Sequence, residues 1–463
     1  MLSKPLIEDM ITAALSTGGD FAEIFVEQKR STTIGMVGGK VENCVTGHDF
    51  GIGIRIFCGL NSIYAYTNEH SRDRLLPLVR QAAQAVRGSR RQDLTLNLMT
   101  APSESRHPVR EVPTAVPYAR KVAVMREADQ IARNFSPEIS QVTVTYLDEE
   151  QEVLIANSEG TFAQDRRIRS RLPITAVASN GSQMQTGFYG PGAHKGFEFF
   201  EELDLRHYAG EAARIAVTML HADECPSGRF PVIIDNEFGG VIMHEACGHG
   251  LEATSVAKKA SVFADRLGEK IAPEIVTYID DGTLANEWGS QNLDDEGAPC
   301  RRNVLIENGV LKGYLIDKLN GRRMGMAPTG SSRRQSYKFA PTSRMTNTFI
   351  APGKHTREEI IANTEFAIYA RYMGGGSVNP ATGEYNFAVR EGYIVRNGKI
   401  AEPVRGATLI GTGFDTLSKI DMVGNNLAHG AGMCGSLSGS LPVNVGQPTI
   451  RVSEITVGGR KGR

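Results

Sequence analysis

Glycine is the residue that most constrains the fold of this chain. It occurs 50 times in 463 residues, against 20 prolines, and it follows no fixed period. Glycine suits tight turns because it adopts positive φ without steric cost, and the lack of a period excludes a collagen-like repeat. The distribution therefore predicts many strands joined by tight turns, in an α+β fold with antiparallel strands.

The bulk composition describes a globular protein of several domains. A chain of this length exceeds one compact core, so we expect two to four domains. Its hydrophobic and charged contents, 41% and 22%, are near globular averages. The formal net charge of −1 argues against nucleic acid or an anionic membrane as a partner.

Three further features predict a cytoplasmic protein. The six cysteines are widely scattered, which indicates reduced thiols rather than a disulfide framework. The N-terminus lacks the hydrophobic block of a signal peptide. No run of residues approaches the ~18 apolar positions that a membrane span needs.

The first 99 residues are predicted to form an N-terminal domain of α/β layers. A helix ends at Gly18-Gly19, and alternating apolar residues then indicate strands that turn at Gly38-Gly39. The expected elements are a helix over 5–17, strands within 20–46 and over 50–58 and 61–67, and a helix over 72–86.

The rest of the chain is divided by a proline-bearing linker over residues 100–116, which contains Pro102, Pro108 and Pro113. A middle α/β domain is expected over 117–224, with helices near 117–134 and 207–220. Residues 225–463 begin with a strand at 230–235 and a helix, followed by about 200 residues rich in strands and turns. We predict that they form a largely antiparallel β domain.

The segment His244-Glu245-Ala246-Cys247-Gly248-His249 lies on this predicted helix. A zinc hydrolase needs three protein ligands, an open position for water and a carboxylate beside that water. His244 and His249 would supply two ligands, and Glu245 would act as the general base. The segment thus predicts a catalytic zinc site on the helix of the third domain.

The spacing of the two histidines predicts a distorted helix. In the familiar H-E-x-x-H the histidines are four residues apart and about 40° apart around the helix. Here they are five apart, which on a regular α-helix separates them by about 140°. A π-bulge would bring both onto one face, and Gly248 and Gly250 would let the backbone widen there.

The residues alone leave two questions open. His244 could instead be a buried core histidine and Glu245 a solvated helix charge. The third ligand also has several candidates, because carboxylates, thiolates and imidazoles all bind zinc. The candidates are Glu252, Cys247, His429 and Cys434.

Motifs along nearly the whole chain resemble the TldD/PmbA family of metallopeptidases, also known as modulators of DNA gyrase. The motifs are Gly51-Ile52-Gly53-Ile54-Arg55-Ile56, the segment from His244 to Glu252, Asp294-Asp295-Glu296-Gly297, Leu305-Ile306-Glu307-Asn308-Gly309, Met324-Gly325-Met326-Ala327-Pro328-Thr329-Gly330, Arg344-Met345-Thr346-Asn347-Thr348, Gly374-Gly375-Gly376 and Gly446-Gln447-Pro448-Thr449. Because both histidines and the glutamate are present, the chain resembles the catalytic, TldD-like branch.

The resemblance implies a ligand set, a substrate and a partner. The third zinc ligand of that branch is a cysteine in a Gly-x-Cys-Gly segment, which matches Cys434. A lysine usually follows this segment in the family, and here the residue is Ser436. Members cleave unfolded or unstructured peptides as dimers, so we expect a homodimer or a heterodimer with a TldE/PmbA-like subunit.

Two polar segments and one alternative function complete the sequence predictions. The basic segment 330–338 is interpreted as a solvated surface loop, with a loop that holds a peptide carboxylate or stabilises an oxyanion as the alternative. Asp294-Asp295-Glu296 is interpreted as an exposed acidic turn, with a metal site as the alternative. The alternative is a non-enzymatic regulatory or scaffold subunit of the gyrase-modulator type, whose structural metal would have four protein ligands. Substrate-binding residues and the oxyanion donor are not assigned by the sequence.

Overall fold

Long antiparallel strands form the first half of the molecule. The computed structural model describes residues 1–86, 96–100, 105–379 and 381–460, and within them this half contains a nine-stranded sheet with the central order β3-β2-β1-β5-β6. Its strands are β1 (Phe21–Val37), β2 (Lys40–Cys58), β3 (Asn61–Thr67), β4 (Met99–Thr100), β5 (Ile139–Asn157), β6 (Thr161–Arg171), β7 (Ile174–Ser179), β8 (Met184–Tyr189) and β9 (Gly192–Ala193). The predicted hairpin at Gly38-Gly39 is confirmed, because β1 and β2 join there.

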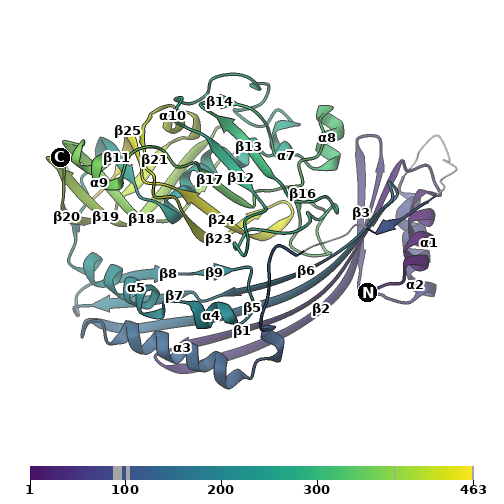
Figure 1. Cartoon of the computed structure of the whole chain (residues 1–463), viewed down its shortest axis with the longest axis horizontal. Coiled ribbons are helices and arrows are strands. Elements are labelled where there is room, and N and C mark those ends of the chain that lie inside the picture. Colours follow the sequence, from purple (N-terminus) through teal and green to yellow (C-terminus); the bar gives the residue numbers. More distant parts are fainter. Residues whose placement is uncertain (87–95, 101–104, 380, 461–463) are drawn as a thin grey trace.

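Helices pack at both ends of this sheet (Figure 1). α1 and α2 form a core with the first part of β1 and the second part of β2, whereas α3 and α5 pack on β5, β7 and β8. The helices of this half are α1 (Lys4–Leu15), α2 (Arg72–Gln84), η1 (Pro113–Ala115), α3 (Tyr118–Arg133), α4 (Glu198–Glu202) and α5 (Leu205–Leu220). The helices predicted near 5–17, 72–86, 117–134 and 207–220 are therefore confirmed.

The strands of the first two predicted domains belong to one sheet, because β1 pairs with β5 over residues 23–37. Part of the predicted linker, residues 101–104 with Pro102, lies outside the described residues. Its described part contacts the third predicted domain: the main-chain nitrogen of Arg106 donates to Asn292 Oδ1 at 2.9 Å. Of the helices in the described ranges, none has both the length and the apolar composition needed to cross a membrane.

Two further sheets form the C-terminal unit. The eight-stranded sheet contains β10 (Asp223–Glu224), β11 (Gly228–Ile234), β18 (Phe366–Val378), β19 (Glu384–Arg396), β20 (Lys399–Arg405), β21 (Thr408–Thr412), β22 (Ile420–Val423) and β25 (Ile450–Gly458). The six-stranded sheet contains β12 (Tyr278–Asp281), β13 (Arg302–Glu307), β14 (Val310–Leu311), β17 (Asn347–Ile350), β23 (Ala428–Ser436) and β24 (Gly439–Gln447). Most pairings are antiparallel and helices accompany both halves of the chain, so the predicted α+β fold is confirmed.

Short elements complete the C-terminal unit and surround one large apolar core. The short strands β15 (Ser332–Arg333) and β16 (Thr342–Ser343) pair with each other. The helical segments are η2 (Glu237–Gly240), α6 (Val241–Met243), η3 (His244–Gly248), η4 (His249–Leu251), α7 (Ala253–Val256), α8 (Lys318–Met324), α9 (Arg357–Ala362) and α10 (Gly413–Ser418). In Figure 1 the long curved sheet runs beneath this unit, and the β23–β24 hairpin faces it.

The prediction that segment 330–338 is a solvated loop is wrong. Arg333 and Arg334 are 1% and 2% exposed. Arg334 Nη2 donates to Glu23 Oε1 at 2.6 Å. Tyr337 is also buried, and its ring lies where a side chain at Gly51 would be. The segment is therefore packed between β1, β2 and the C-terminal unit.

The prediction that Asp294-Asp295-Glu296 is an exposed turn is also wrong, because all three are at most 2% exposed. Asp295 accepts a 2.8 Å hydrogen bond from Arg167 of β6, and Glu296 accepts a 2.6 Å hydrogen bond from Arg55 of β2. A buried carboxylate is tolerated when it is paired and hydrogen-bonded. The strands of the first sheet supply the arginines that allow this acidic segment to be buried.

Candidate metal centre

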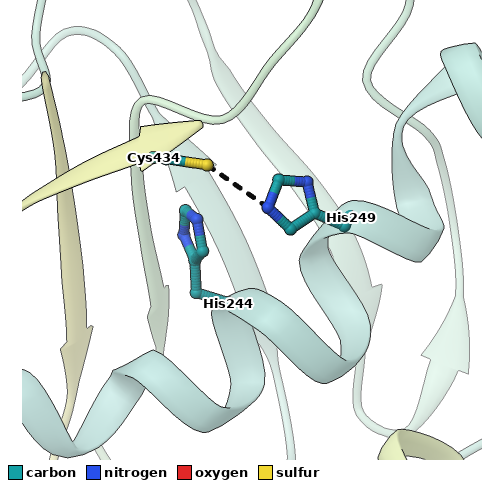
Figure 2. A group of neighbouring side chains, drawn as sticks. All are labelled: His244, His249 and Cys434. Carbon is teal, nitrogen blue, oxygen red and sulfur yellow. Dashed lines mark hydrogen bonds between the residues drawn. The ribbon is translucent and has the colours of Figure 1, made fainter. Parts of the chain in front are cut away.

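The helix that carries the two histidines is π-helical at the predicted place. The segment His244–Gly248 is a π-turn, and the main-chain nitrogen of His249 donates to the carbonyl oxygen of His244, five residues earlier. This confirms the distortion predicted from the five-residue spacing. Both imidazoles consequently lie on one face, with ring centroids 5.3 Å apart and ring planes at 84° (Figure 2).

Cys434 reaches the two histidines from β23, 185 residues beyond His249 in sequence. Its Sγ lies 3.2 Å from His249 Nε2. One ligand atom from each of His244, His249 and Cys434 lies within 4.8 Å of the others, and all three residues are buried. Figure 2 shows the Cys434 side chain projecting from its strand toward His249, with His244 beside it on the helical segment.

The remaining ring nitrogens are held by neighbouring side chains. His249 Nδ1 lies 3.0 Å from Glu252 Oε2, and because a carboxylate accepts, the ring donates there; in the neutral imidazole that a metal would bind, Nε2 then carries the lone pair. His244 Nδ1 lies 3.0 Å from Thr348 Oγ1 of β17. His244 Nε2 is buried and has no hydrogen-bond partner. This pattern, with one nitrogen oriented and the other free toward a common point, suits a metal-ligating histidine.

The electrostatics of the cluster favour a thiolate. Burial by itself raises the pKa of the Cys434 thiol, but His244 and His249 outweigh burial and lower that pKa from 9.0 to about 3. Burial lowers the pKa of His249, whereas Glu252 and Cys434 raise it well above its ordinary value. A thiolate and two imidazoles form a donor set that zinc prefers, so the residues present fit a zinc ion.

The other candidate ligands lie elsewhere. The Cys247 Sγ faces the carbonyl oxygen of Gly413 at 3.8 Å, and burial raises its pKa to about 12. His429 is an odd number of residues before Cys434 on the same strand, so it projects from the opposite face, where its ring meets Phe349 edge-on. In the described part of the chain, no fourth His, Cys, Asp or Glu joins the cluster.

Glu245 lies beside the cluster and is partly open to solvent. Its Oε2 is 3.5 Å from His249 Nε2, and its side chain is 25% exposed. By contrast Glu252, which we considered as a ligand from the sequence, is buried against the back of His249. A carboxylate at the open side of three ligands is placed to exchange protons with water there.

Arg344 positions the cysteine, a role that the sequence analysis does not predict. Its guanidinium donates from Nη2 to the carbonyl oxygen of Cys434 at 2.6 Å and from Nη1 to Ser438 Oγ at 2.9 Å. Its Nε lies 3.9 Å from Glu252 Oε1. The motif Arg344-Met345-Thr346-Asn347-Thr348 was the available signal, since it supplies both this arginine and the threonine beside His244.

Comparison with known proteins places the chain in a family. Models of the PmbA/TldA metallopeptidase family match it in three parts: domain 1 over residues 22–86, the central domain over 111–220 and the C-terminal domain over 227–459. A metalloprotease TldD homolog from Haemophilus influenzae is 35% identical over 454 residues, which is 95% of this chain and 93% of that protein. The chain belongs to the PmbA/TldA metallopeptidase family.

Further relatives extend this likeness. A metalloprotease from Methanothermobacter thermautotrophicus is 35% identical over 444 residues, covering 95% of this chain and 96% of its own. The crystal structure of TldE from Thermococcus kodakarensis superposes with a TM-score of 0.76 at 18% identity, covering 98% of this chain and all of that chain. The sequence relatives support a metallopeptidase, and the solved structure supports the fold.

Proposed function

We propose that this protein is a zinc-dependent peptidase that cleaves unfolded or unstructured peptides. One observation carries the proposal: His244, His249 and Cys434 converge within 4.8 Å, with a partly exposed carboxylate, Glu245, beside them. Three ligands and an adjacent carboxylate are the requirements of a catalytic zinc site. When bound, zinc would act as a Lewis acid toward the scissile carbonyl and activate water.

The roles of the chain's own residues follow from their positions. His244, His249 and Cys434 would hold the zinc ion, while Thr348 and Glu252 would fix the orientation of the two imidazoles. Glu245 would accept a proton from the attacking water and return it to the leaving amine. The burial of the ligands would keep bulk water from the metal on all but the side that Glu245 faces.

Two features support an extended peptide as substrate. In the described residues the metal-bearing β23 pairs with no strand other than β24. An extended peptide can add to such an edge through main-chain hydrogen bonds, at positions other than the carbonyl oxygens that already accept from Arg171, Trp288 and Arg344. The long sheet also covers the β23–β24 hairpin (Figure 1). A folded substrate would have to displace this layer. We propose that the protein acts as a dimer with a second copy or a TldE-like subunit, as predicted from the family resemblance.

The competing function, a regulatory or scaffold subunit with a structural metal, is less well supported. A structural zinc site uses four protein ligands, whereas the described residues offer three in the cluster. The curated relatives are named metalloproteases.

The test compares the zinc-loaded wild-type protein with Glu245→Gln, using unfolded casein and a fluorogenic peptide. We expect zinc content and folding to persist and cleavage to fall by a factor of ~10²–10⁴, the usual contribution of a general base. Glu274→Gln, at an exposed position of the same unit, is the control and should cleave normally. Full activity of Glu245→Gln would remove Glu245 from the mechanism.

A further inference from the structure

A cavity of about 480 Å³ lies between the long sheet and the metal-bearing unit. Residues of β1, β5 and β6 line one side, and residues of β23, β24 and segment 333–335 line the other. This volume falls in the range of about 300–1,000 Å³ that is typical of ligand pockets. None of the three proposed metal ligands lines it, so it is a separate part of the molecule.

Basic side chains dominate the wall of this cavity. They are Lys29, Arg167, Arg169, Arg171, Arg333 and Arg334. The acidic side chains of the wall, Asp148 and Glu149, are already paired, with Lys121 at 2.6 Å and Lys29 at 3.4 Å respectively. The wall therefore carries an excess of positive charge.

Three of these arginines have no carboxylate partner within 4.0 Å in the described residues; they are Arg169, Arg171 and Arg333. Arg169 donates to the carbonyl oxygens of Trp288 and Ser290. Arg171 donates to the carbonyl oxygens of Gly190 and Ala431. Guanidinium groups held away from water with no carboxylate in direct contact are costly. Arg169 and Arg333 are buried and Arg171 is partly buried, so these three side chains around one cavity indicate a binding site for an anion.

The pKa values of two of these arginines also fit a site for an anion. Burial, together with the charge of Arg167, lowers the pKa of Arg169 to about 10. Burial and the nearby Arg169 lower the pKa of Arg333 to about 9. A bound anion would reverse both effects, because an opposite charge favours the protonated form.

The cavity shares a wall with the metal centre. Arg333 Nη2 donates at 2.7 Å to the carbonyl oxygen of Pro442 on β24. Met433 and Pro442 are cross-strand partners that line the cavity, and the next pair along the hairpin is Cys434 with Leu441. Adjacent residues of a strand project to opposite faces, so Met433 faces the cavity while the Cys434 thiol faces the histidines on the other side of the hairpin.

We propose that this cavity binds the carboxylate side chain of an extended peptide, so that the protein prefers substrates that carry an Asp or Glu. The peptide as substrate rests on the proposed function above, but binding of the carboxylate does not. Arg169, Arg171 and Arg333 would supply charge-assisted hydrogen bonds, which are stronger than neutral ones. Nucleic acid fits less well, because the cavity lies between two protein layers and the net charge of the chain is −1.

Trp288 makes this proposal directly measurable. It is the only tryptophan in the sequence, it lines the cavity, and the Arg171 guanidinium lies 5.5 Å from its ring centroid. Its fluorescence should therefore report occupation of the cavity. We would titrate zinc-loaded, full-length Glu245→Gln, which binds without cleaving, with a blocked tetraglutamate peptide and with the isosteric tetraglutamine peptide.

We expect the glutamate peptide to change the Trp288 fluorescence and to bind at least about ten-fold more tightly than the glutamine peptide, with an affinity that falls as salt is raised. In the Glu245→Gln background, Arg171→Gln should abolish the difference in affinity between the two peptides. Arg171→Lys should retain part of that difference. Arg206→Gln, at an exposed site on α5, is the matched control and should retain the full difference.

Equal affinities for the two peptides would overturn the proposal, and so would an Arg171→Gln variant that still discriminates between them. Tighter binding of an oligothymidylate, with the same fluorescence change, would replace the peptide by nucleic acid and also overturn it. Because no cleavage is required, failure here is distinct from failure of the proposed peptidase activity. In the wild-type enzyme, kcat/KM for a Glu-containing peptide should exceed that for the matching Gln peptide by a similar factor.

Discussion

Arg344 donates a 2.6 Å hydrogen bond to the main-chain carbonyl oxygen of Cys434, and the same guanidinium faces Glu252 across 3.9 Å. One buried arginine thus touches both the strand that carries the thiol and the carboxylate that orients His249. These two ligands come from segments 185 residues apart. Arg344 is the side chain that fixes their relative position.

Replacement of Arg344 by lysine is expected to weaken zinc binding. Lysine retains the charge but lacks the planar fork that reaches Cys434 and Ser438 together. Loss of such an orienting partner typically lowers metal affinity about 10–100-fold. Competition with a chelator of known affinity measures this, with Arg302→Lys, on the exposed side of β13, as control. Unchanged zinc affinity would limit Arg344 to a structural role.

Cys434→Ala should lower zinc occupancy and peptide cleavage together. The thiol supplies one of three ligands in the proposed site, and two ligands hold zinc poorly. Cys44→Ala and Cys58→Ala on β2 should change neither property, because these cysteines lie in the other half of the molecule. Metal analysis of the three purified variants gives the answer. Full zinc occupancy in Cys434→Ala would exclude the cysteine as a ligand.

Gly413→Ala is expected to disturb the π-turn. A Cβ at Gly413 would lie 2.1 Å from the carbonyl oxygen of Ala246, within the turn that carries both histidines. Such overpacking typically destabilises by about 1–3 kcal/mol, and here it should also lower zinc affinity. Gly210→Ala in α5 is the matched control: its Cβ meets nothing within 4 Å, and stability should rise by about 0.5–1 kcal/mol. Urea unfolding and chelator competition measure the two effects.

Because the pKa of Glu237 is raised, we expect the free energy of unfolding to fall as the pH rises from about 4.5 to 7. Burial raises the pKa of this carboxyl from 4.5 to about 7, against the opposing hydrogen bond from Tyr189. In this window the native protein retains a proton that the unfolded chain has released, so the free energy of unfolding falls as pH rises. Glu237→Gln should reduce that slope, whereas Glu274→Gln should leave it unchanged. Equal slopes for wild type and Glu237→Gln would contradict the prediction.

The local features of this fold could be predicted from neighbouring residues. The turn at Gly38-Gly39 and the glycines that end α1 are encoded within a few positions. The π-turn was equally predictable, because two ligands on one helix must share a face and five-residue spacing allows this only if the helix widens. The choice of Cys434 needed the family resemblance, since nothing local to it distinguishes it from Cys247.

Long-range burial could not be predicted in this way. From the sequence, Arg334 and Asp295 are expected at the surface, because each is surrounded by polar neighbours. Arg334 is buried against Glu23, 311 residues away, and Asp295 against Arg167, 128 residues away. Charged side chains are tolerated inside a protein only when the fold brings a partner to them. The neighbouring residues in the sequence do not identify that partner.

Glu23 accepts hydrogen bonds from Arg55 of its own sheet and from Arg334 of the C-terminal unit, and all three side chains are buried. Separating the two halves would leave these charges in apolar surroundings or force each to be hydrated anew. The halves should therefore melt in a single cooperative transition. A fragment that begins at residue 225 would leave Asp295 and Glu296 without Arg167 and Arg55, so the metal-bearing unit depends on the N-terminal sheet for its own folding.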